Sequence, residues 1–236
     1  MTLPIELHDD DGAPADELPD ELPALPIFPL ANCVLLPGGM LPLHIFEPRY
    51  RELARAALAG DHLIAIARLR PGRDAEYEGR PPVFPMAGVG RIICAEEMAD
   101  GRFMLLLHGV GRVKIEHELP AAHAFRQVRA RVVRDAGTSD AQRFRAARDR
   151  LLELCDLLAR ALDACGNQGG EQLRELARCD RGPGSCADAV AAALIMDTAE
   201  RYRMLENPCP EARIRTTIEA VSQMLCAMAP CDGEVN

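Results

Sequence analysis

Short apolar runs separated by prolines fill the stretch from Leu25 to Tyr50, around which the rest of the chain is organised. Prolines interrupt it at positions 26, 29, 37, 42 and 48. Because proline has no backbone N–H, it occurs at strand starts, edges and bulges rather than inside a central strand. The pattern therefore predicts short strands joined by bends, a turn at Pro37-Gly38-Gly39, and a helix that begins at Pro48.

Beyond this stretch the hydrophobic period identifies one helix and several strands. Apolar residues recur at helical spacing over Arg49–Ala59, which predicts a helix that Gly60 caps. His62–Leu69 is largely apolar and predicts a buried strand. Residues 70–82 carry glycines, prolines and charges, so a surface loop is expected there. Arg126–Arg134 alternates apolar and polar residues and predicts the last strand.

Asp100-Gly101 separates two long apolar segments and predicts a hairpin. We expect antiparallel strands over Val89–Met98 and Arg102–Leu119, joined by the primed turn that Asp-Gly favours. Paired glycines occur in both segments, in GVGRI at 88–92 and GVGRV at 109–113. A dinucleotide fingerprint would need a third glycine at position 93, which is Ile93. Bulges that bend the strands into a barrel explain these glycines better.

From about Thr138 the hydrophobic period changes to that of helices. The first predicted helix is long and runs from Ser139 or Asp140 to about Gly166, and a short one follows at Glu171–Cys179. A Ser185/Asp188 capping box is predicted to open the next helix, Cys186–Met196, and a further helix runs from Asp197 or Thr198 to Glu206. The last predicted helix has an apolar stripe of Ile214, Ile218, Val221, Leu225 and Met228. Together they predict a bundle of four or five helices.

Composition restricts the class of protein. With 236 residues, 48% of them hydrophobic, the chain can bury a sizeable core. It contains no apolar run long enough to span a membrane, and its start lacks the features of a secretory signal, so we expect a cytoplasmic protein. Eight acidic residues and no Lys or Arg precede Ala24, so most of the net charge of −9 lies in residues 1–23. This proline-containing segment is predicted to be a disordered arm.

The sequence contains no convincing catalytic, cofactor or metal pattern. The nine cysteines include no C-x-x-C pair and are predicted to be mostly buried small hydrophobic residues. His44 and Glu47 straddle a strand end and a helix start, which does not suit a helical metal pair. His117-Glu118 lacks the second histidine of H-E-x-x-H, and no phosphate-binding P-loop is present. We therefore predict no metal, no cofactor and no catalytic residues.

Three consecutive motifs carry a resemblance to a known family. P-x-F-P-L, V-L-x-P-G and L-P-L-x-I-F-E-P-R-Y, at residues 26–30, 34–38 and 41–50, resemble the amino-terminal domain of Lon proteases. The chain looks most like stand-alone bacterial proteins that carry only this domain, and the resemblance covers about 24–229. It implies the α+β class, with a strand-rich, PUA-like pseudo-barrel followed by a C-terminal helical bundle, and it implies polypeptide recognition without catalysis.

This interpretation divides the chain into four parts. Residues 1–23 are the acidic arm, 24–136 the barrel subdomain, 137–230 the helical bundle and 231–236 a tail. Within the barrel, the predicted polypeptide-binding residues are Leu36, Pro37, Met40, Leu41, Leu43 and Phe46. The predicted structural motif consists of Pro29, Pro42, His44, Glu47, Pro48, Arg49 and Tyr50. We expect His44 and Glu47 to bond the bent backbone, and Glu47 and Arg49 to form an ion pair.

The expected function is non-enzymatic polypeptide binding in protein quality control or as an adaptor. The expected partners are an unfolded or client polypeptide, a protease or ATPase, and a second copy in a weak homodimer, with no membrane partner and nucleic acid disfavoured. One alternative is an RNA-binding PUA-like module, whose basic groove would use Arg112, Arg126, Arg129 and Arg131. Another is a small-molecule enzyme that uses Cys94 or His108.

Overall fold

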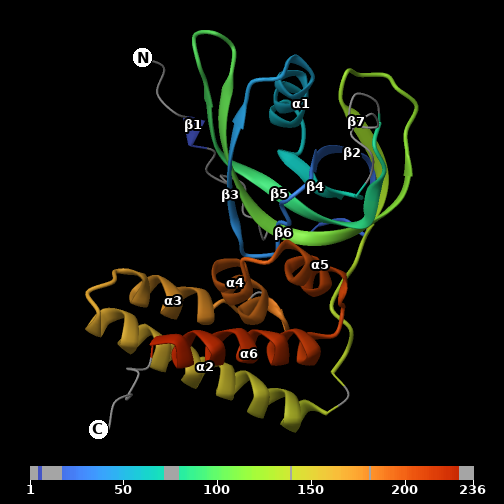
Figure 1. Cartoon of the computed structure of the whole chain (residues 1–236). Helices are drawn as coiled ribbons and strands as arrows, with labels where there is room; N and C mark the ends of the chain where they lie inside the picture. Colours follow the sequence, from blue (N-terminus) through green and yellow to red (C-terminus); the bar gives the residue numbers. More distant parts are fainter. Residues whose placement is uncertain (1–4, 7–17, 72–79, 139, 181, 229–236) are drawn as a thin grey trace, which may run out of the picture. The chain divides into compact units, whose positions relative to one another are not determined.

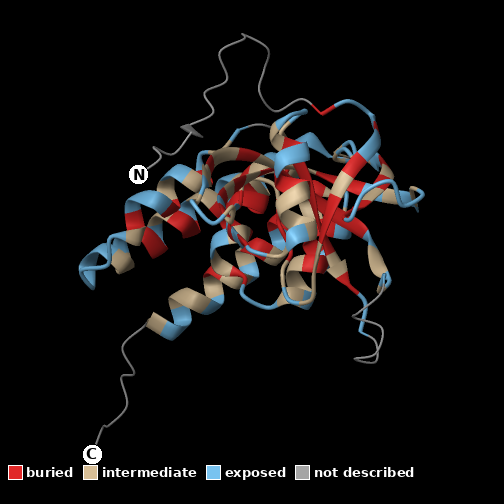
Figure 2. Cartoon of the chain, turned by 90° about the horizontal axis from the view of Figure 1, so that it is seen from above, coloured by how far each residue is buried: buried red, intermediate tan, exposed pale blue. Residues whose placement is uncertain are grey.

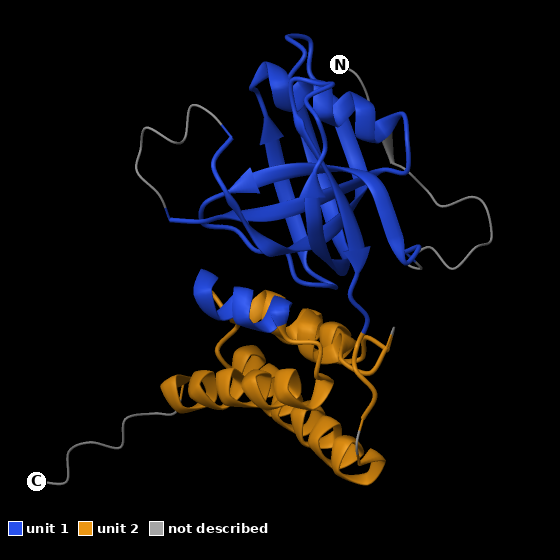
Figure 3. Ribbon diagram, turned by 90° about the vertical axis from the view of Figure 1, so that its right-hand side faces the viewer, with its two compact units in different colours: residues 1–134, 197–206 blue, residues 135–196, 207–236 orange. Residues whose placement is uncertain are grey.

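The computed structural model describes residues 5–6, 18–71, 80–138, 140–180 and 182–228. It contains two compact units, which Figure 3 colours separately. Unit 1 comprises the chain up to Arg134 together with Asp197–Glu206, and unit 2 comprises 135–196 and the chain after Glu206. Each unit has its own apolar core, so each is described in turn.

Unit 1 is built on a seven-stranded sheet that curls into a barrel (Figure 1). Its strands are β1 (Ile5–Glu6), β2 (Glu21–Leu30), β3 (Met40–Ile45), β4 (Leu63–Leu69), β5 (Val83–Glu97), β6 (Phe103–Glu118) and β7 (Arg126–Val132), and its helices are α1 (Pro48–Leu58) and α5 (Thr198–Glu206). The strand order is β1-β5-β4-β2-β7-β6-β3, and an additional β5–β6 pairing closes the five middle strands into a ring. β1 and β3 are added outside that ring.

The barrel core follows from the alternation of side chains along each strand (Figure 2). Val128 and Ala130 of β7 are both fully buried, as the alternation predicted. β4 is buried on both faces: Ile64 and Ile66 pack in one cluster that includes residues of α1, while Ala65 and Ala67 pack in a second cluster. This double burial explains why the sequence of β4 is apolar throughout.

The segment between β2 and β3 crosses the glycines of β5 and β6 at very close range. A Cβ on Gly88 would lie 1.9 Å from the carbonyl oxygen of Leu35, and one on Gly109 would lie 2.2 Å from that of Leu36. A register shift next to Gly90 confirms a bulge at these glycines. The closeness of the crossing backbone is a second reason for glycine, one that strand patterning alone does not reveal.

β5 and β6 form the predicted hairpin, but with a different turn. The N–H of Gly101 donates to the carbonyl of Met98, and the N–H of Met98 donates to the carbonyl of Arg102, each at 2.8 Å. Gly101 has a φ of +78°, whereas Ala99 and Asp100 keep negative φ. A primed two-residue turn would need a positive φ earlier in the loop, so the connection is a three-residue loop that ends in a glycine bulge.

Unit 2 is helical and comprises α2 (Ala141–Ala164), α3 (Gly169–Ala177), α4 (Ser185–Leu194) and α6 (Pro210–Met228). Leu158, Val190 and Ile214 come from three different helices and are fully buried in one core. The carboxylate of Asp140 accepts hydrogen bonds from the backbone N–H groups of two residues at the start of α2, each at 3.0 Å. This confirms the predicted cap and, with the barrel, the predicted α+β class.

The helix α5 belongs to unit 1, whereas the sequence placed it in the helical bundle. The hydroxyl of Tyr202 accepts a hydrogen bond from the N–H of Met86 at 3.2 Å, and its ring centroid lies 4.8 Å from that of Phe84. The carbonyl of Met204 accepts a bond from Arg112 at 3.5 Å. A stripe of apolar residues shows that a helix has a buried face, but not which surface covers it.

A buried arginine connects three segments of unit 2. Arg213 on α6 has no exposed surface, and its guanidinium lies 2.6 Å from the carboxylate of Asp135 and 2.9 Å from that of Asp188. It also donates to the carbonyl of Asn207 at 2.8 Å. The predicted Ser185/Asp188 capping box is therefore wrong: Asp188 pairs with Arg213, and the Ser185 hydroxyl donates to backbone carbonyl groups.

The predicted disordered arm of residues 1–23 is wrong in part. Leu18 and Leu22 are buried, and β2 already begins at Glu21. Ile5–Glu6 pairs with β5. Leu18 and Leu22 pack in the barrel core, which the acidic average composition of the segment does not indicate. Residues 1–4 and 7–17, the tail 231–236 and most of the loop predicted at 70–82 lie outside the described residues.

Candidate functional site

The ring of unit 1 leaves an opening at its side between the end of β2 and β3, which do not pair with each other. β6 pairs with β3 over Phe103–His108 and with β7 over Val113–Glu118. β2 pairs with β7 only as far as Ile27, so the described strands leave Phe28–Leu30 unpaired on that side. Likewise, β6 is the only described strand that pairs with β3. Two unpaired strand edges therefore border the opening.

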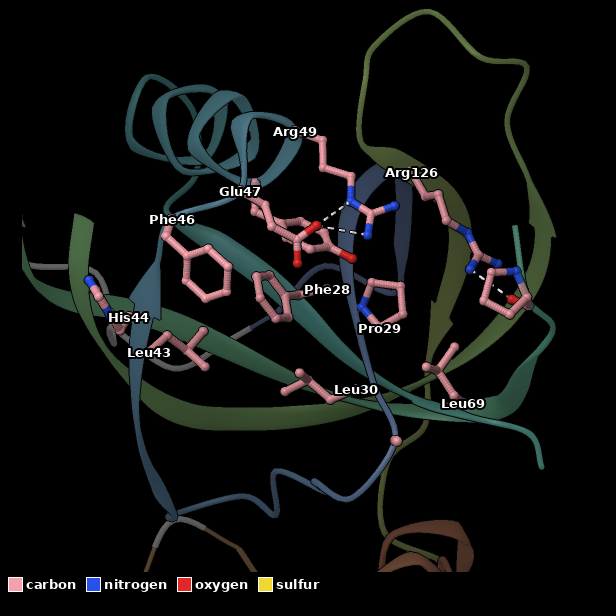
Figure 4. Close-up of a pocket in the computed structure, with 13 residues that line it drawn as sticks. Phe28, Pro29, Leu30, Leu43, His44, Phe46, Glu47, Arg49, Leu69 and Arg126 are labelled. Carbon is pink, nitrogen blue, oxygen red and sulfur yellow. Dashed lines mark hydrogen bonds and ion pairs between the residues drawn. The ribbon is translucent and has the colours of Figure 1, made fainter. Parts of the chain in front are cut away.

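A pocket of about 390 Å³ occupies this opening (Figure 4). It is lined by residues of β2, β3, β4 and β7, the start of α1 and the segments that adjoin these elements. The lining residues are Phe28, Pro29, Leu30, Ala31, Leu43, His44, Phe46, Glu47, Arg49, Tyr50, Leu69, Pro81 and Arg126. Most of them are apolar, and the volume is in the lower part of the range of ligand pockets.

Aromatic side chains form one wall of the pocket. The ring of Phe28 lies 4.2 Å, between centroids, from that of Tyr50. Phe46, which follows β3 directly, is 61% exposed although it is large and apolar. Its neighbour Leu43 is buried and extends the apolar surface inward. An exposed aromatic residue beside an apolar pocket is typical of surfaces that receive side chains from a partner.

Ion pairs lie beside the aromatic side chains. Arg49 lies 2.8 Å from the carboxylate of Glu47, which confirms the predicted pair at the start of α1. Arg126 is 8% exposed, pairs with Glu118, and donates to the carbonyl of Pro81 at 2.8 Å. The pocket is therefore lined by both apolar and charged groups.

Tyr50 contributes a polar group to the aromatic wall. Its ring lies under the guanidinium of Arg49, 4.7 Å from the ring centroid. Burial raises the pKa of Tyr50 above its ordinary value, while Arg49 acts in the opposite direction. The hydroxyl is therefore protonated at neutral pH and can donate a hydrogen bond.

The structure does not bring together a catalytic or metal-binding group within its described part. No cluster of three His, Cys, Asp or Glu side chains suited to a metal occurs among residues 5–6, 18–71, 80–138, 140–180 and 182–228. The expectation of mostly buried cysteines is wrong, because only Cys155 and Cys186 of those described are buried, and Cys165 and Cys226 are exposed. Burial raises the pKa of Cys155 to about 12, which disfavours its nucleophilic thiolate.

His44 does not have its predicted role. Its Nε2 lies 3.4 Å from a guanidinium nitrogen of Arg102, and the side chain is exposed on β3, so it does not bond the bent backbone. Glu47 bonds Arg49 rather than the backbone. The prolines of this stretch remove backbone donors, which leaves these two side chains to pair with arginines instead.

The residues predicted from the sequence divide into three groups. The pocket is lined by Pro29, Leu43, His44, Phe46, Glu47, Arg49 and Tyr50. Met40 is 51% exposed on β3 and lies outside the pocket. The pocket lining also does not include Pro37, Leu41, Pro42 and Pro48. Leu36 is only 1% exposed, so it belongs to the core and not to a binding surface.

Sequence reasoning missed the three lining residues that lie far away in the chain. Leu69, Pro81 and Arg126 come from β4, the segment before β5, and β7. No local pattern links these positions to the proline-rich stretch. The sequence could have indicated Phe28 as a lining residue, since it stands between two prolines near the end of the first predicted strand.

The four arginines of the proposed RNA groove are engaged within the protein. Arg112 is buried and bonds the carbonyl of Met204, and Arg126 pairs with Glu118. Arg129 and Arg131 both lie within 3.5 Å of carboxylates of Glu21 and Glu116. Phosphate binding requires exposed cations that are free to replace counterions, whereas three of these arginines already pair with carboxylates and Arg112 is buried.

The fold is shared with solved Lon N-terminal domains. It is similar to the N-terminal domain of the Mycobacterium avium complex Lon protease, with a TM-score of 0.62 and 21% identity over 84% of this chain and 98% of that one. It is also similar to a Lon N-terminal domain protein from Xanthomonas campestris, with a TM-score of 0.55 and 19% identity over the same shares. A strand barrel with an added helical unit is thus a fold of Lon N-terminal domains.

The chain belongs to the family described as the ATP-dependent protease La (LON) substrate-binding domain, whose profile matches residues 24–223. It is 26% identical to Lon protease 2 of Myxococcus xanthus over 84% of this chain and 23% of that protein. It is also 26% identical to the Lon protease of Anaeromyxobacter dehalogenans, over 86% of this chain and 24% of that protein. The chain therefore spans about a quarter of these relatives. In the described residues, no helix is long and apolar enough to cross a membrane.

Proposed function

We propose that this chain binds polypeptides without catalysing a reaction, and that the pocket between β2 and β3 is the binding site. The observation that carries the proposal is the mostly apolar pocket of about 390 Å³ with Phe46, 61% exposed, at its mouth. Membership of a substrate-binding family supports it. An exposed aromatic residue beside a pocket offers a partner both contact area and a place for a side chain.

The proposed clients are unfolded or partly unfolded chains, which expose the apolar side chains that such a pocket can accept. Met40 lies on the same strand as the pocket residues and is 51% exposed. Methionine adapts its shape to different neighbours, which suits a surface that accepts varied sequences. We place this activity in protein quality control, where the chain would act as an adaptor that presents clients to a protease or ATPase partner.

Substitution of the exposed apolar residues tests the proposal. We expect Phe46→Asp to weaken binding of a fluorescent, reduced and carboxymethylated lactalbumin at least tenfold, because an aromatic anchor is lost. Met40→Asp should weaken it less, since this residue lies outside the pocket. Fluorescence anisotropy measures both affinities, and circular dichroism confirms that the variants remain folded.

Met196→Asp is the matched control, because Met196 is 72% exposed and belongs to unit 2. Its affinity should equal that of the unchanged protein. If the unchanged protein does not bind the unfolded probe, or if all three variants bind it equally well, the proposed function is wrong.

A further inference from the structure

We propose that the client binds as an extended strand that pairs with the edge of β3 left uncovered by the described strands, here called the free edge, and places one apolar side chain in the pocket. This inference rests on the proposed function and specifies how the binding occurs. It commits to one occupant, an extended polypeptide segment that carries a bulky apolar residue next to an acidic one. The register of β3, its proline, the position of the pocket and the charges around it support this mode of binding.

The register shows which backbone groups of β3 face outward. Leu41, Leu43 and Ile45 are paired with Leu107, Leu105 and Phe103 of β6. The N–H of Gly109 donates to the carbonyl of Gly39 at 2.8 Å, so Gly39 is a position whose backbone bonds β6. In an antiparallel pair, bonded positions alternate with positions whose backbone groups point away. The backbone groups of residues 40, 42 and 44 therefore point to the free edge.

Pro42 occupies one of these outward positions. Since it has no N–H, the edge offers the carbonyl groups of residues 40, 42 and 44 but only the N–H groups of Met40 and His44. The proline is compatible with the strand because no bond to β6 is lost. A proline at an edge also limits uncontrolled pairing between copies. The remaining donors and acceptors still suit the addition of one short strand.

The pocket lies where a side chain of an added strand would enter. Leu43, His44 and Phe46 at the end of β3 line it on one side, and Phe28 and Leu30 line it on the other (Figure 4). In a strand, alternate side chains point to the same face, so one residue of an added strand can face the pocket while its neighbours face solvent. Backbone bonds would then supply affinity, and the pocket would supply selectivity.

The charges near the pocket favour an acidic client. Among the described residues around the pocket, three arginines, Arg49, Arg80 and Arg126, form ion pairs with two glutamates, Glu47 and Glu118. Arg80 lies 3.9 Å from Glu118, a carboxylate that already binds Arg126 more closely, so its charge is only partly balanced. An acidic residue beside the inserted side chain would complement this excess of one positive charge.

Peptides with blocked backbone groups test strand addition directly. The probe is a fluorescent ten-residue peptide with capped ends, in which aromatic and polar residues alternate around one central aspartate. N-methylation of alternate residues removes the N–H groups along one edge of the extended peptide. We expect methylation of one set to weaken binding at least tenfold, and methylation of the other set to change it less than threefold.

The outcomes separate this inference from the proposed function. If both methylated peptides bind as well as the parent, strand addition is wrong, whereas polypeptide binding stands. If neither the parent peptide nor the unfolded lactalbumin binds, the proposed function fails as well. If the protein alone forms dimers that are lost in His44→Pro, the edge is occupied by a second copy, and strand addition by a client is overturned.

Substitutions in β3 provide the matching test on the protein. We expect His44→Pro to weaken binding of the parent peptide about three- to tenfold, because it removes an outward N–H without affecting the bonds to β6. His44→Ala keeps the N–H and should weaken binding less. Pro42→Thr restores an N–H at the edge and should tighten binding about three- to tenfold. A gain of affinity cannot result from unfolding, so equal affinity for Pro42→Thr and the unchanged protein counts against strand addition.

Exchanging the charge of the peptide tests the acidic preference separately. Replacing the central aspartate of the peptide by lysine should weaken binding at least threefold at low salt and less at high salt, since exposed charges are screened. If the lysine peptide binds as tightly as the aspartate peptide, the acidic preference is wrong.

Discussion

Individual residues set how closely the backbone segments of unit 1 approach one another. The carbonyl oxygen of Leu35 occupies the space that a side chain on Gly88 would need. At Gly111 the nearest atom to an added Cβ is the end of the Leu18 side chain, at 2.7 Å, which can move. A backbone neighbour cannot yield in this way. The same added methyl group should therefore have different effects at the two positions.

We expect Gly88→Ala to lower the free energy of unfolding by about 2–3 kcal/mol, because the added methyl overpacks a rigid part of the core. Gly111→Ala, the matched control, should lower it by less than about 1 kcal/mol. Urea denaturation measures both. Equal losses at the two positions would show that the crossing segment shifts as easily as a side chain.

The buried arginine of unit 2 provides a second contrast at this scale. Arg213→Ala would leave Asp135 and Asp188 without their cation, so we expect a loss of about 3–5 kcal/mol in the free energy of unfolding. Arg150 pairs with Glu153 on the surface of α2, where both side chains are more than half exposed. Arg150→Ala should cost less than about 1 kcal/mol. Similar losses in urea denaturation for the two variants would contradict this account of Arg213.

At the scale of elements, the turn from α1 to β4 shows how the end of a helix departs from its sequence signal. Gly60 was expected to cap the helix, yet α1 ends at Leu58 with Ala59 as its C-cap, and the described residue with positive φ in this turn is His62, at 58°. The N–H groups of Gly60 and His62 both donate to the carbonyl of Ala57. The left-handed residue is therefore two positions later than predicted.

We expect His62→Gly to raise the free energy of unfolding by about 0.5–1 kcal/mol, because glycine adopts positive φ without strain. The control is His117→Gly on β6, where the backbone is extended, and here we expect a loss of about 0.5–1 kcal/mol. Thermal unfolding of both variants checks the opposite signs. A loss for His62→Gly would mean that its side-chain contacts outweigh the backbone strain.

At the scale of the whole molecule, the two units have separate cores, and a buried thiol makes the stability of unit 2 depend on alkaline pH. Burial, with a smaller effect of Cys186, raises the pKa of Cys155 in unit 2 from 9.0 to about 12. A group whose pKa is raised by folding contributes its full stability below the pKa of the unfolded chain. That contribution is lost as the pH rises from about 9 to 12, because only the unfolded state releases the proton.

We therefore expect Cys155 to account for a fall of about 1.4 kcal/mol in the free energy of unfolding between pH 8 and pH 10. Cys155→Ala should show a correspondingly smaller fall over this range, whatever its stability at pH 8. Cys226→Ala, at an exposed position, should keep the full pH dependence. Urea denaturation at the two pH values measures the difference. Identical pH dependence in Cys155→Ala and the unchanged protein would refute it.

About half of the candidate site could be predicted from the sequence. The proline-rich stretch placed Leu43, Phe46 and Arg49 at the junction of a strand and a helix, because proline restricts the local backbone. Arg126 and Leu69 could not be predicted, since they reach the pocket only through the closure of the barrel. Leu36 was misplaced because an apolar residue next to a turn has the same local pattern whether it is buried or exposed.

The sequence by itself determined the order and type of the elements from β2 onward, from the proline-broken strands and the Asp-Gly hairpin to the helices of the second half, because these depend on backbone restrictions and on local periodicity. Only the tertiary structure decided that α5 joins the barrel, that β3 keeps a free edge beside a pocket, and that Gly88 makes room for Leu35. These features depend on contacts between residues far apart in the chain, and such contacts follow from how whole surfaces fit together, which local patterns do not specify.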